Sequence, residues 1–314
     1  MFPCWSQIVL WGLVFIVATL IVCYIYTYTQ LSNAANIFID ELSKKFDKPC
    51  DLKFPLEYRE AVYVPKKNGF YEKRLATALI DTCYITSAAN CPSVTIPNPP
   101  GFTHQLRLEG IEPVSKQQVF LAYIYWNEEC QKAMIAFTGT QQKVLWRADA
   151  RYQQVAPTLL NGYEPGMLVH SGFYEVYLAV REQLWAWWNA NESWLKVLYM
   201  TGHSLGAALS TLLAFDFADQ MRKCRKIPIQ YTFGSPRVGN VQFAQAFNKK
   251  MWPSIRVNNT EDPVTALPLA QMFDFTYEQV AQDVPFTASL GSTYANHVDA
   301  YYYNLPDRGN CYIT

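Results

Sequence analysis

The five residues at positions 202–206, Gly-His-Ser-Leu-Gly, constrain the fold of this chain more than any other part of its sequence. Before them, residues 194–200 alternate and are rich in bulky side chains, which predicts a β-strand. After them, residues 205–217 are rich in Ala and Leu, which predicts a helix. The backbone must reverse sharply between the two, and glycines remove the Cβ atoms that would clash there. The pattern therefore predicts a nucleophile elbow, with the hydroxyl of Ser204 exposed at the carboxyl end of the strand.

The chain offers one candidate for the base that such a serine requires. A serine hydroxyl is a weak nucleophile at neutral pH, so a neighbouring base must take its proton. In enzymes built on this elbow the acid and then the histidine follow the serine in the chain. Of the four histidines, His104, His170 and His203 precede Ser204, and His297 alone follows it. His297 is therefore the predicted base.

The acid that orients this base must lie between Ser204 and His297. Asp262 ends a predicted short strand at residues 254–262, and Pro263 keeps it out of the helical region. A carboxylate held on such a turn can fix the tautomer of an imidazole and stabilise the imidazolium. Asp262 is the predicted acid, and its neighbour Glu261 is the main alternative. The other acidic residues in this interval are Asp216, Asp219, Asp274, Glu278 and Asp283.

An oxyanion hole needs two hydrogen-bond donors. The residue after the nucleophile, Leu205, is expected to supply a backbone N–H. The second donor should come from the loop after an earlier strand, and residues 131–137 predict such a strand. Gly139 permits a tight turn after it, and Thr140 offers a backbone N–H and a hydroxyl. An ordinary β-turn at this position is the alternative interpretation.

The chain closely resembles the class 3, fungal-type triacylglycerol lipase family over roughly residues 70–305. The resemblance rests on six blocks that match in order and spacing, at residues 137–140, 146–149, 169–173, 202–206, 231–239 and 259–263. One departure is Thr138, where the family often carries Arg. The resemblance implies that Ser204, Asp262 and His297 form the catalytic triad and that Thr140 and Leu205 line the oxyanion hole. It implies no metal and no cofactor.

Three further features are interpreted beside this resemblance. His170 and His203 are predicted to be structural, hydrogen-bonded core residues.

Residues 141–152 are the predicted lid, because Val144, Leu145 and Trp146 place apolar bulk next to charged side chains. Such a segment can cover an acyl groove in water and open at a lipid surface. A fixed surface helix would have the same composition.

The N-terminus carries an apolar run at residues 8–26 with no charged side chain. A helix of this length would span a bilayer core of roughly 30 Å. Residues 1–29 are therefore expected to be an uncleaved signal anchor, with a signal peptide cleaved near residues 32–34 as the alternative. Residues 30–68 are interpreted as a linker and wrapping segment, and residues 69–314 as one α/β domain.

Two features favour a lumenal or extracellular catalytic domain, although Lys44, Lys45 and Lys48 after the apolar run weakly favour the opposite orientation. Glycosylation sequons begin at Asn191, in a predicted loop, and at Asn258, on a predicted strand. Six of the eight cysteines lie beyond the apolar run, and this even number predicts disulfide bonds of open connectivity. They are Cys50, Cys83, Cys91, Cys130, Cys224 and Cys311.

These observations predict an α/β-hydrolase with a doubly wound, mostly parallel sheet, plus an N-terminal transmembrane helix. The net charge of zero gives no basic surface for nucleic acid, and the oligomeric state is left open. We expect a lipase that cleaves acylglycerol esters at a membrane or emulsion surface. A phospholipase A1, a feruloyl-type esterase and a transacylase are the alternatives among enzymes. The non-enzymatic alternative is a tethered lipid-binding scaffold that retains the hydrolase fold.

Overall fold

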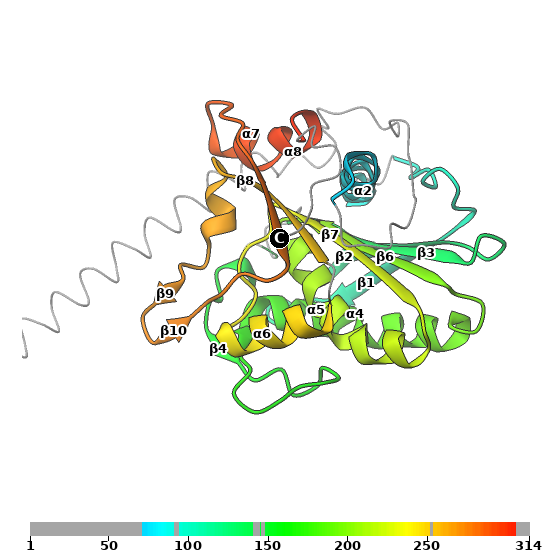
Figure 1. Cartoon of the computed structure of the whole chain (residues 1–314), viewed down its shortest axis with the longest axis horizontal. Helices are drawn as coiled ribbons and strands as arrows, with labels where there is room; N and C mark the ends of the chain where they lie inside the picture. The colour runs from blue at the N-terminus through cyan, green and yellow to red at the C-terminus, as the bar shows by residue number, and fades with distance from the viewer. Residues whose placement is uncertain (1–70, 91–93, 141–144, 146–147, 252–253, 306–314) are drawn as a thin grey trace, which may run out of the picture. The chain divides into compact units, whose positions relative to one another are not determined.

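The structure is a computed structural model that describes residues 71–90, 94–140, 145, 148–251 and 254–305. A seven-stranded sheet organises this part of the chain (Figure 1). The strand order is β1-β2-β3-β6-β7-β8-β11. The first three strands pair antiparallel, and every pair from β3 onward is parallel. The predicted mostly parallel sheet is therefore confirmed, with an antiparallel extension at one edge. The strands are β1 (His104–Ile111), β2 (Gln118–Asn127), β3 (Lys132–Phe137), β6 (Val197–His203), β7 (Ile227–Phe233), β8 (Ser254–Asn259) and β11 (Gln282–Phe286).

Helices cover both faces of this sheet. One face carries α4 (Ser171–Asn191), α5 (Leu205–Lys223) and α6 (Val241–Lys250), and the other carries α2 (Lys73–Ser87) and α8 (Asp299–Tyr303) (Figure 1). Each helical layer packs on its own apolar core. Short elements connect these layers: η1 (Ala88–Asn90), β4 (Gln154–Val155), β5 (Val169–His170), η2 (Pro263–Ala266), β9 (Gln271–Met272), β10 (Phe275–Thr276) and α7 (Thr293–His297).

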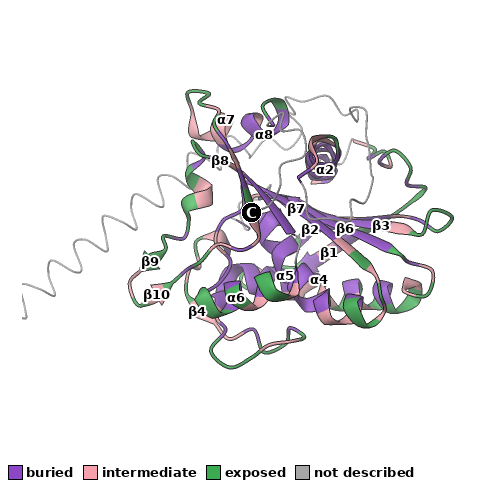
Figure 2. Cartoon of the chain, in the orientation of Figure 1, coloured by how far each residue is buried: buried purple, intermediate pink, exposed green. Residues whose placement is uncertain are grey.

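The central strand β6 shows why the two cores require this sequence. Leu198 and Met200 point into the core beneath α4 and α5, whereas Val197 and Tyr199 point into the core beneath α2. Successive side chains of a strand face opposite sides of a sheet. A strand covered on both faces therefore carries an unbroken apolar run, here residues 197–200, and all seven residues of β6 are buried (Figure 2).

The predicted N-terminal membrane anchor falls outside the described residues, as do residues 30–68. Among the residues that the structure does describe, no helix is both long enough and apolar enough to cross a membrane.

The predicted disulfide bonds are not confirmed. Cys83, Cys130 and Cys224 carry free thiols. Cys83 faces the core, where its Sγ lies 3.3 Å from the hydroxyl oxygen of Thr201, and burial raises the pKa of this thiol to about 12. Cys83 therefore acts as a small buried residue rather than as half of a cross-link. Cys50, Cys91 and Cys311 lie outside the described residues.

Asn191, the preferred sequon, is the last residue of α4 rather than part of a loop. Its side-chain amide donates to the carbonyl of Trp187 at 2.8 Å, and its Oδ1 accepts from the Trp194 indole at 3.2 Å. The amide therefore has partners within the fold.

A buried ion pair joins α4 to α5. The carboxylate of Asp216 is fully buried and accepts hydrogen bonds from Arg181 at 2.8 Å, Tyr177 at 2.8 Å and the Trp185 indole at 3.0 Å. It also accepts from the backbone N–H of Asn161 at 2.7 Å, which fixes the loop before β5. Both oxygens of the Asp216 carboxylate therefore accept hydrogen bonds, as a buried charge requires.

Replacing Asp216 with Ala is therefore expected to lower the free energy of unfolding by about 3 kcal/mol, because Arg181, whose side chain is 15% exposed, loses its buried counter-charge and three further donors lose their acceptor. Denaturant unfolding of the purified chain measures this. Asp219→Ala is the matched control, since that carboxylate is 45% exposed and exposed ion pairs contribute about 0–1 kcal/mol. Equal losses in the two variants would contradict the structural role of Asp216.

Candidate active site

Ser204 lies at the turn between β6 and α5, in a backbone conformation that side chains rarely adopt. Its φ is 59° and its ψ is −126°. The N–H of Ser204 donates to the carbonyl of Phe233 on β7 at 3.0 Å. A Cβ on Gly202 would lie 2.1 Å from the carbonyl oxygen of Gly206, and one on Gly206 would lie 2.6 Å from that of Thr138. The two glycines therefore allow β6, α5 and the end of β3 to approach closely enough to hold Ser204.

Two hydrogen bonds link Ser204 to a histidine and a carboxylate. His297 Nε2 lies 2.8 Å from Ser204 Oγ, and His297 Nδ1 lies 2.8 Å from Asp262 Oδ2. An ionised carboxylate only accepts, so Nδ1 carries the proton and Nε2 is free to accept from the serine hydroxyl. His297 and Asp262 are buried, whereas Ser204 is half-buried. The structure thus brings together the three side chains that the sequence predicts.

The other acidic candidates lie elsewhere. Glu261 is exposed, and its backbone carbonyl, not its carboxylate, accepts from Asn296. Asp216 and Asp219 pair with basic residues around α5, and Asp283 pairs with Arg256 at 2.9 Å. Asp274 lies in the turn between β9 and β10, and Glu278 is exposed.

Tyr301 on α8 is a site residue that sequence reasoning missed. Its hydroxyl donates to Asp262 Oδ2 at 2.7 Å and accepts from the N–H of Asn259 at 3.1 Å. Asp262 Oδ1 accepts from the N–H of Val264 at 2.9 Å. Burial, together with the negative charge of Asp262, raises the pKa of Tyr301 well above its ordinary value, so the hydroxyl keeps its proton. Both carboxylate oxygens of Asp262 are therefore held by donors.

His203 and His170 have structural contacts. The ring of His203 lies 4.6 Å from that of His297, and its Nε2 lies 2.6 Å from the backbone carbonyl of His297. Burial lowers the pKa of His203 well below its ordinary value, so this nitrogen donates as a neutral imidazole. His170 stacks on Phe173 with ring centroids 3.7 Å apart, and burial lowers its pKa to about 3.

The predicted oxyanion loop lies against the elbow. A Cβ on Gly139 would lie 3.3 Å from the backbone oxygen of His203 and 3.8 Å from the Cβ of Ser204. Thr140 follows, and its hydroxyl donates to Asp149 Oδ2 at 2.7 Å. Leu205 is the first residue of α5, so its N–H is at the helix N-terminus. Leu205 therefore adjoins Ser204 in the chain, and Gly139, the residue before Thr140, lies against the elbow.

Asp149, like Tyr301, makes a contact that the sequence did not reveal, namely the hydrogen bond from the Thr140 hydroxyl. It lies in one of the blocks of the family resemblance. Burial raises the pKa of the Asp149 carboxyl to about 7, opposed by the Thr140 hydrogen bond and by the charges of His297 and Arg151. Its Oδ1 is buried and has no hydrogen-bond partner among the described residues. The carboxyl therefore titrates near neutrality beside the oxyanion loop.

Leu145 is the one described residue of the three predicted lid positions, since Val144 and Trp146 lie outside the described residues. Leu145 is fully buried and belongs to the core beneath α4 and α5. It is therefore not part of an exposed apolar surface.

A strained serine at the carboxyl end of a mostly parallel sheet, linked to a histidine and a carboxylate, is typical of the α/β-hydrolase fold. Comparison of folds agrees. The structure is similar to a fungal lipase–inhibitor complex (TM-score 0.53, 22% identity, covering 67% of this chain and 77% of that one). It is also similar to a mono- and diacylglycerol lipase from Aspergillus oryzae (TM-score 0.52, 20% identity, 73% and 83%). At these identities the likeness shows the fold alone.

Comparison of sequences gives a similarity over part of the chain. Residues 134–272 match the model of the class 3 lipases. The chain is 32% identical over 149 residues to phospholipase A(1) DAD1 of Arabidopsis thaliana (43% of this chain, 33% of that one). It is 31% identical over 156 residues to the secreted mono- and diacylglycerol lipase A of Penicillium cyclopium (48% and 47%). The matches thus span a third to about half of these relatives. Over residues 134–272 the chain is therefore similar to the class 3 lipases.

The raised pKa of Asp149 predicts a pH dependence of stability. Its folded value of about 7 exceeds the ordinary carboxyl value of 3.8, so the folded state binds this proton more tightly than the unfolded state. The stability that this proton gives the folded state is fully present below about pH 4 and is lost as the pH rises through 7. Relative to the natural chain, Asp149→Asn should therefore gain stability between pH 4 and pH 7, by up to about 4 kcal/mol.

Denaturant unfolding at half-unit pH intervals measures this gain. Glu128→Gln, at an exposed carboxylate, is the control and should not change with pH relative to the natural chain. A constant difference between Asp149→Asn and the natural chain would show that folding does not raise the pKa of Asp149.

Proposed function

We propose that this chain is a serine carboxylester hydrolase, a lipase that cleaves acylglycerol esters. The observation that carries the proposal is the unbroken chain of hydrogen bonds from Ser204 through His297 to Asp262. In the proposed reaction, Ser204 Oγ attacks the ester carbonyl while His297 Nε2 takes its proton. Asp262 holds the imidazole in the reactive tautomer and stabilises the imidazolium that forms.

The proposed oxyanion hole is formed by Leu205 and Thr140. The carbonyl oxygen of the ester gains negative charge as the serine adds, and N–H donors at the start of α5 stabilise that charge. The hydrogen bond from the Thr140 hydroxyl to Asp149 leaves the Thr140 N–H, rather than its hydroxyl, as the donor for the oxyanion while Asp149 is ionised.

The cycle is completed without a cofactor. The tetrahedral intermediate collapses, and His297 passes its proton to the departing alcohol, which leaves an acyl group on Ser204. Water then adds to the acyl-enzyme, and His297 again takes and returns the proton. The products are a fatty acid and the alcohol.

A phospholipase A1 activity is the second candidate. The relative in Arabidopsis thaliana carries that name, and the relative in Penicillium cyclopium is named as a mono- and diacylglycerol lipase. Both reactions would use the same site. The two substrates differ in the glycerol part of the ester, which carries a phosphate head group only in a phospholipid. The proposal of a secreted or membrane-anchored chain rests on residues 8–26 and on the secreted relative.

Substitution of Ser204 and of its acid tests the proposed chemistry. Ser204→Ala should lower turnover of a soluble short-chain p-nitrophenyl ester by about 10⁶-fold. Asp262→Asn should lower it by about 10⁴-fold, because the amide favours the wrong tautomer of His297. Glu261→Gln is the matched control and should leave turnover unchanged, because its carboxylate is exposed. An emulsified triacylglycerol and a phosphatidylcholine vesicle then identify the preferred ester.

A folded chain that fails to cleave any of these three substrates would contradict the proposal and favour the scaffold alternative. A loss of turnover in Glu261→Gln that equals the loss in Asp262→Asn would reassign the acid.

Tyr301→Phe tests how the acid is positioned. Without the hydroxyl, Asp262 loses one charge-assisted hydrogen bond and its negative charge interacts more strongly with His297. We expect kcat for the soluble ester to fall about tenfold and the apparent pKa of the base in the pH profile of kcat/KM to rise. Tyr303→Phe, at an exposed tyrosine of the same helix, is the control. A fall in kcat with an unchanged pH profile would indicate a structural role only.

A further inference from the structure

The segment after the proposed catalytic acid exposes apolar side chains. Residues 263–270 read Pro-Val-Thr-Ala-Leu-Pro-Leu-Ala and contain no charge. Leu267 is 38% exposed and Leu269 is 51% exposed. Most of this segment is exposed (Figure 2). Large apolar side chains gathered on one exposed segment usually mark a surface that contacts a partner.

A second exposed apolar segment precedes the proposed base. Residues 287–291 also lack charge, and Leu290 is 40% exposed. Asn296 links this segment to the residue before Asp262, because its Oδ1 accepts from the N–H of Leu290 at 2.7 Å and its Nδ2 donates to the carbonyl of Glu261 at 3.1 Å. Residues 263–270 and 287–291 are called the leucine rim below. The leucine rim directly adjoins Asp262 and precedes His297 by a few residues.

The leucine rim is held in place from within. Arg237 donates its backbone N–H to the carbonyl of Leu267 at 2.7 Å. Its guanidinium donates to the carbonyls of Pro268, at 2.8 Å, and Ala266. The backbone is therefore held at Leu267 and on both sides of it, with the Leu267 side chain 38% exposed.

The surroundings of the leucine rim carry negative charge. Arg237 places one cation against the rim, but residues 257–305 contain no Lys or Arg. Glu261, Asp274 and Glu278 are exposed in this interval. Within the described part of the chain, the carboxylates of Glu261 and Asp274 form no ion pair. Such a surface repels an anionic membrane, to which each Lys or Arg would contribute attraction.

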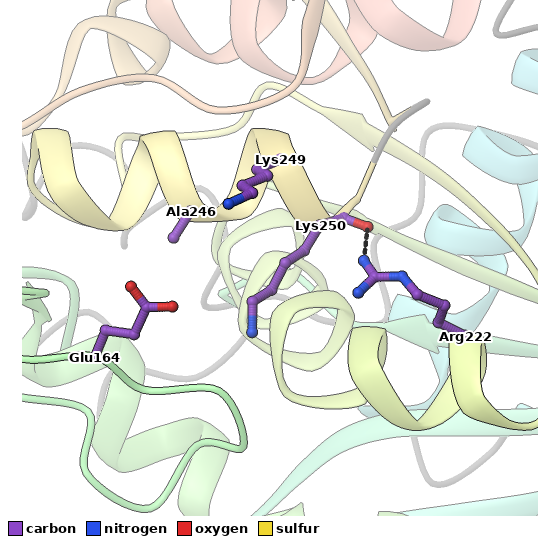
Figure 3. Close-up of a pocket in the computed structure, with 5 residues that line it drawn as sticks. All are labelled: Glu164, Arg222, Ala246, Lys249 and Lys250. Carbon is purple, nitrogen blue, oxygen red and sulfur yellow. Dashed lines mark hydrogen bonds between the residues drawn. The ribbon is translucent and has the colours of Figure 1, made fainter.

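Positive charge gathers at the far end of α5. This helix begins beside Ser204, and its 19 residues give a length of about 28 Å. Basic side chains lie at the C-terminal ends of α5 and α6: Arg222, Lys223, Arg225, Lys249 and Lys250. Figure 3 shows Arg222, Lys249 and Lys250 beside Glu164, around a surface pocket of about 520 Å³. An anionic lipid surface would attract the C-terminal end of α5 and so turn the leucine rim away from the lipid.

We infer that the leucine rim is the lipid-contact surface of this chain and that it selects lipid surfaces without net negative charge. This inference rests on the proposed function, because it places the ester beside Ser204. Leu267, Leu269 and Leu290 would enter the lipid, where burial of their side chains is favourable. The acidic surroundings would oppose contact with an anionic leaflet, and the opposition would weaken as salt screens the charges.

The test uses the full chain and one uncharged substrate, a fluorescent diacylglycerol, at a fixed fraction in two kinds of vesicle. One vesicle is pure phosphatidylcholine, and the other contains phosphatidylglycerol as well. We expect about tenfold slower hydrolysis on the anionic vesicle, which is the effect of a leaflet potential on two unpaired carboxylates. The difference should shrink at high salt and in the double variant Glu261→Gln, Asp274→Asn.

Serine substitution of the leucines tests the contact itself. The double variant Leu267→Ser, Leu269→Ser should cleave the vesicle substrate several-fold more slowly and keep its turnover of a soluble p-nitrophenyl ester. The matched control is Leu106→Ser, Ile111→Ser, at two exposed apolar residues of β1, and it should match the natural chain. Flotation of the same variants in a Ser204→Ala background measures vesicle binding without catalysis.

Equal rates on the two vesicles would overturn the inference, and so would equal effects of the rim and β1 variants. Neither outcome would contradict the proposed function as long as the soluble ester is cleaved. Soluble-ester activity without any vesicle hydrolysis would also overturn the inference. Loss of activity on every ester would overturn the proposed function, and the inference would fall with it.

Discussion

The reversal of the chain at Ser204 is the constraint on which the rest of the site depends. A non-glycine residue with φ of 59° and ψ of −126° costs about 1–3 kcal/mol and persists only where its surroundings hold it. Here β7 accepts the N–H of Ser204, and the N–H of Ala207 in α5 donates to the Ser204 carbonyl at 2.9 Å. Because Gly202 and Gly206 allow the backbones to touch, strand, turn and helix form one rigid unit. The serine is positioned by the core of the protein rather than by a flexible loop.

The acid and the base are positioned against that unit by two buried polar side chains. His203, within the elbow, binds the backbone carbonyl of His297. Asn259, at the end of β8, is fully buried and donates to the carbonyls of Ala288 and Asn296, each at 3.0 Å. The segment that carries Asp262 and the segment that carries His297 are therefore joined by hydrogen bonds from the side-chain amide of Asn259. A buried network of this kind fixes geometry because each unmet bond would be costly.

The sequence predicts those parts of the protein that depend on local pattern and chain order. The elbow, its flanking strand and helix, and the mostly parallel sheet follow from glycine spacing and from the period of apolar residues. The hydrogen bonds of Tyr301 and Asp149 do not, because Tyr301 meets Asp262 only when β8 and α8 come together. The state of Cys83 could not be predicted either, since an even count of cysteines carries no information about which of them face the core.

The loops that bear the acid and the base also bear the leucine rim, and this shared backbone restricts how the two functions can change. Arg237 and Asn296 fix the rim through main-chain carbonyls and N–H groups, so a shift of the rim backbone would move Asp262 and His297 with it. The side chains at Leu267 and Leu269, in contrast, point away from these bonds into solvent. Substitutions there can therefore alter which lipid surface is contacted without altering the chemistry at Ser204, whereas insertions in the same loops would disturb both.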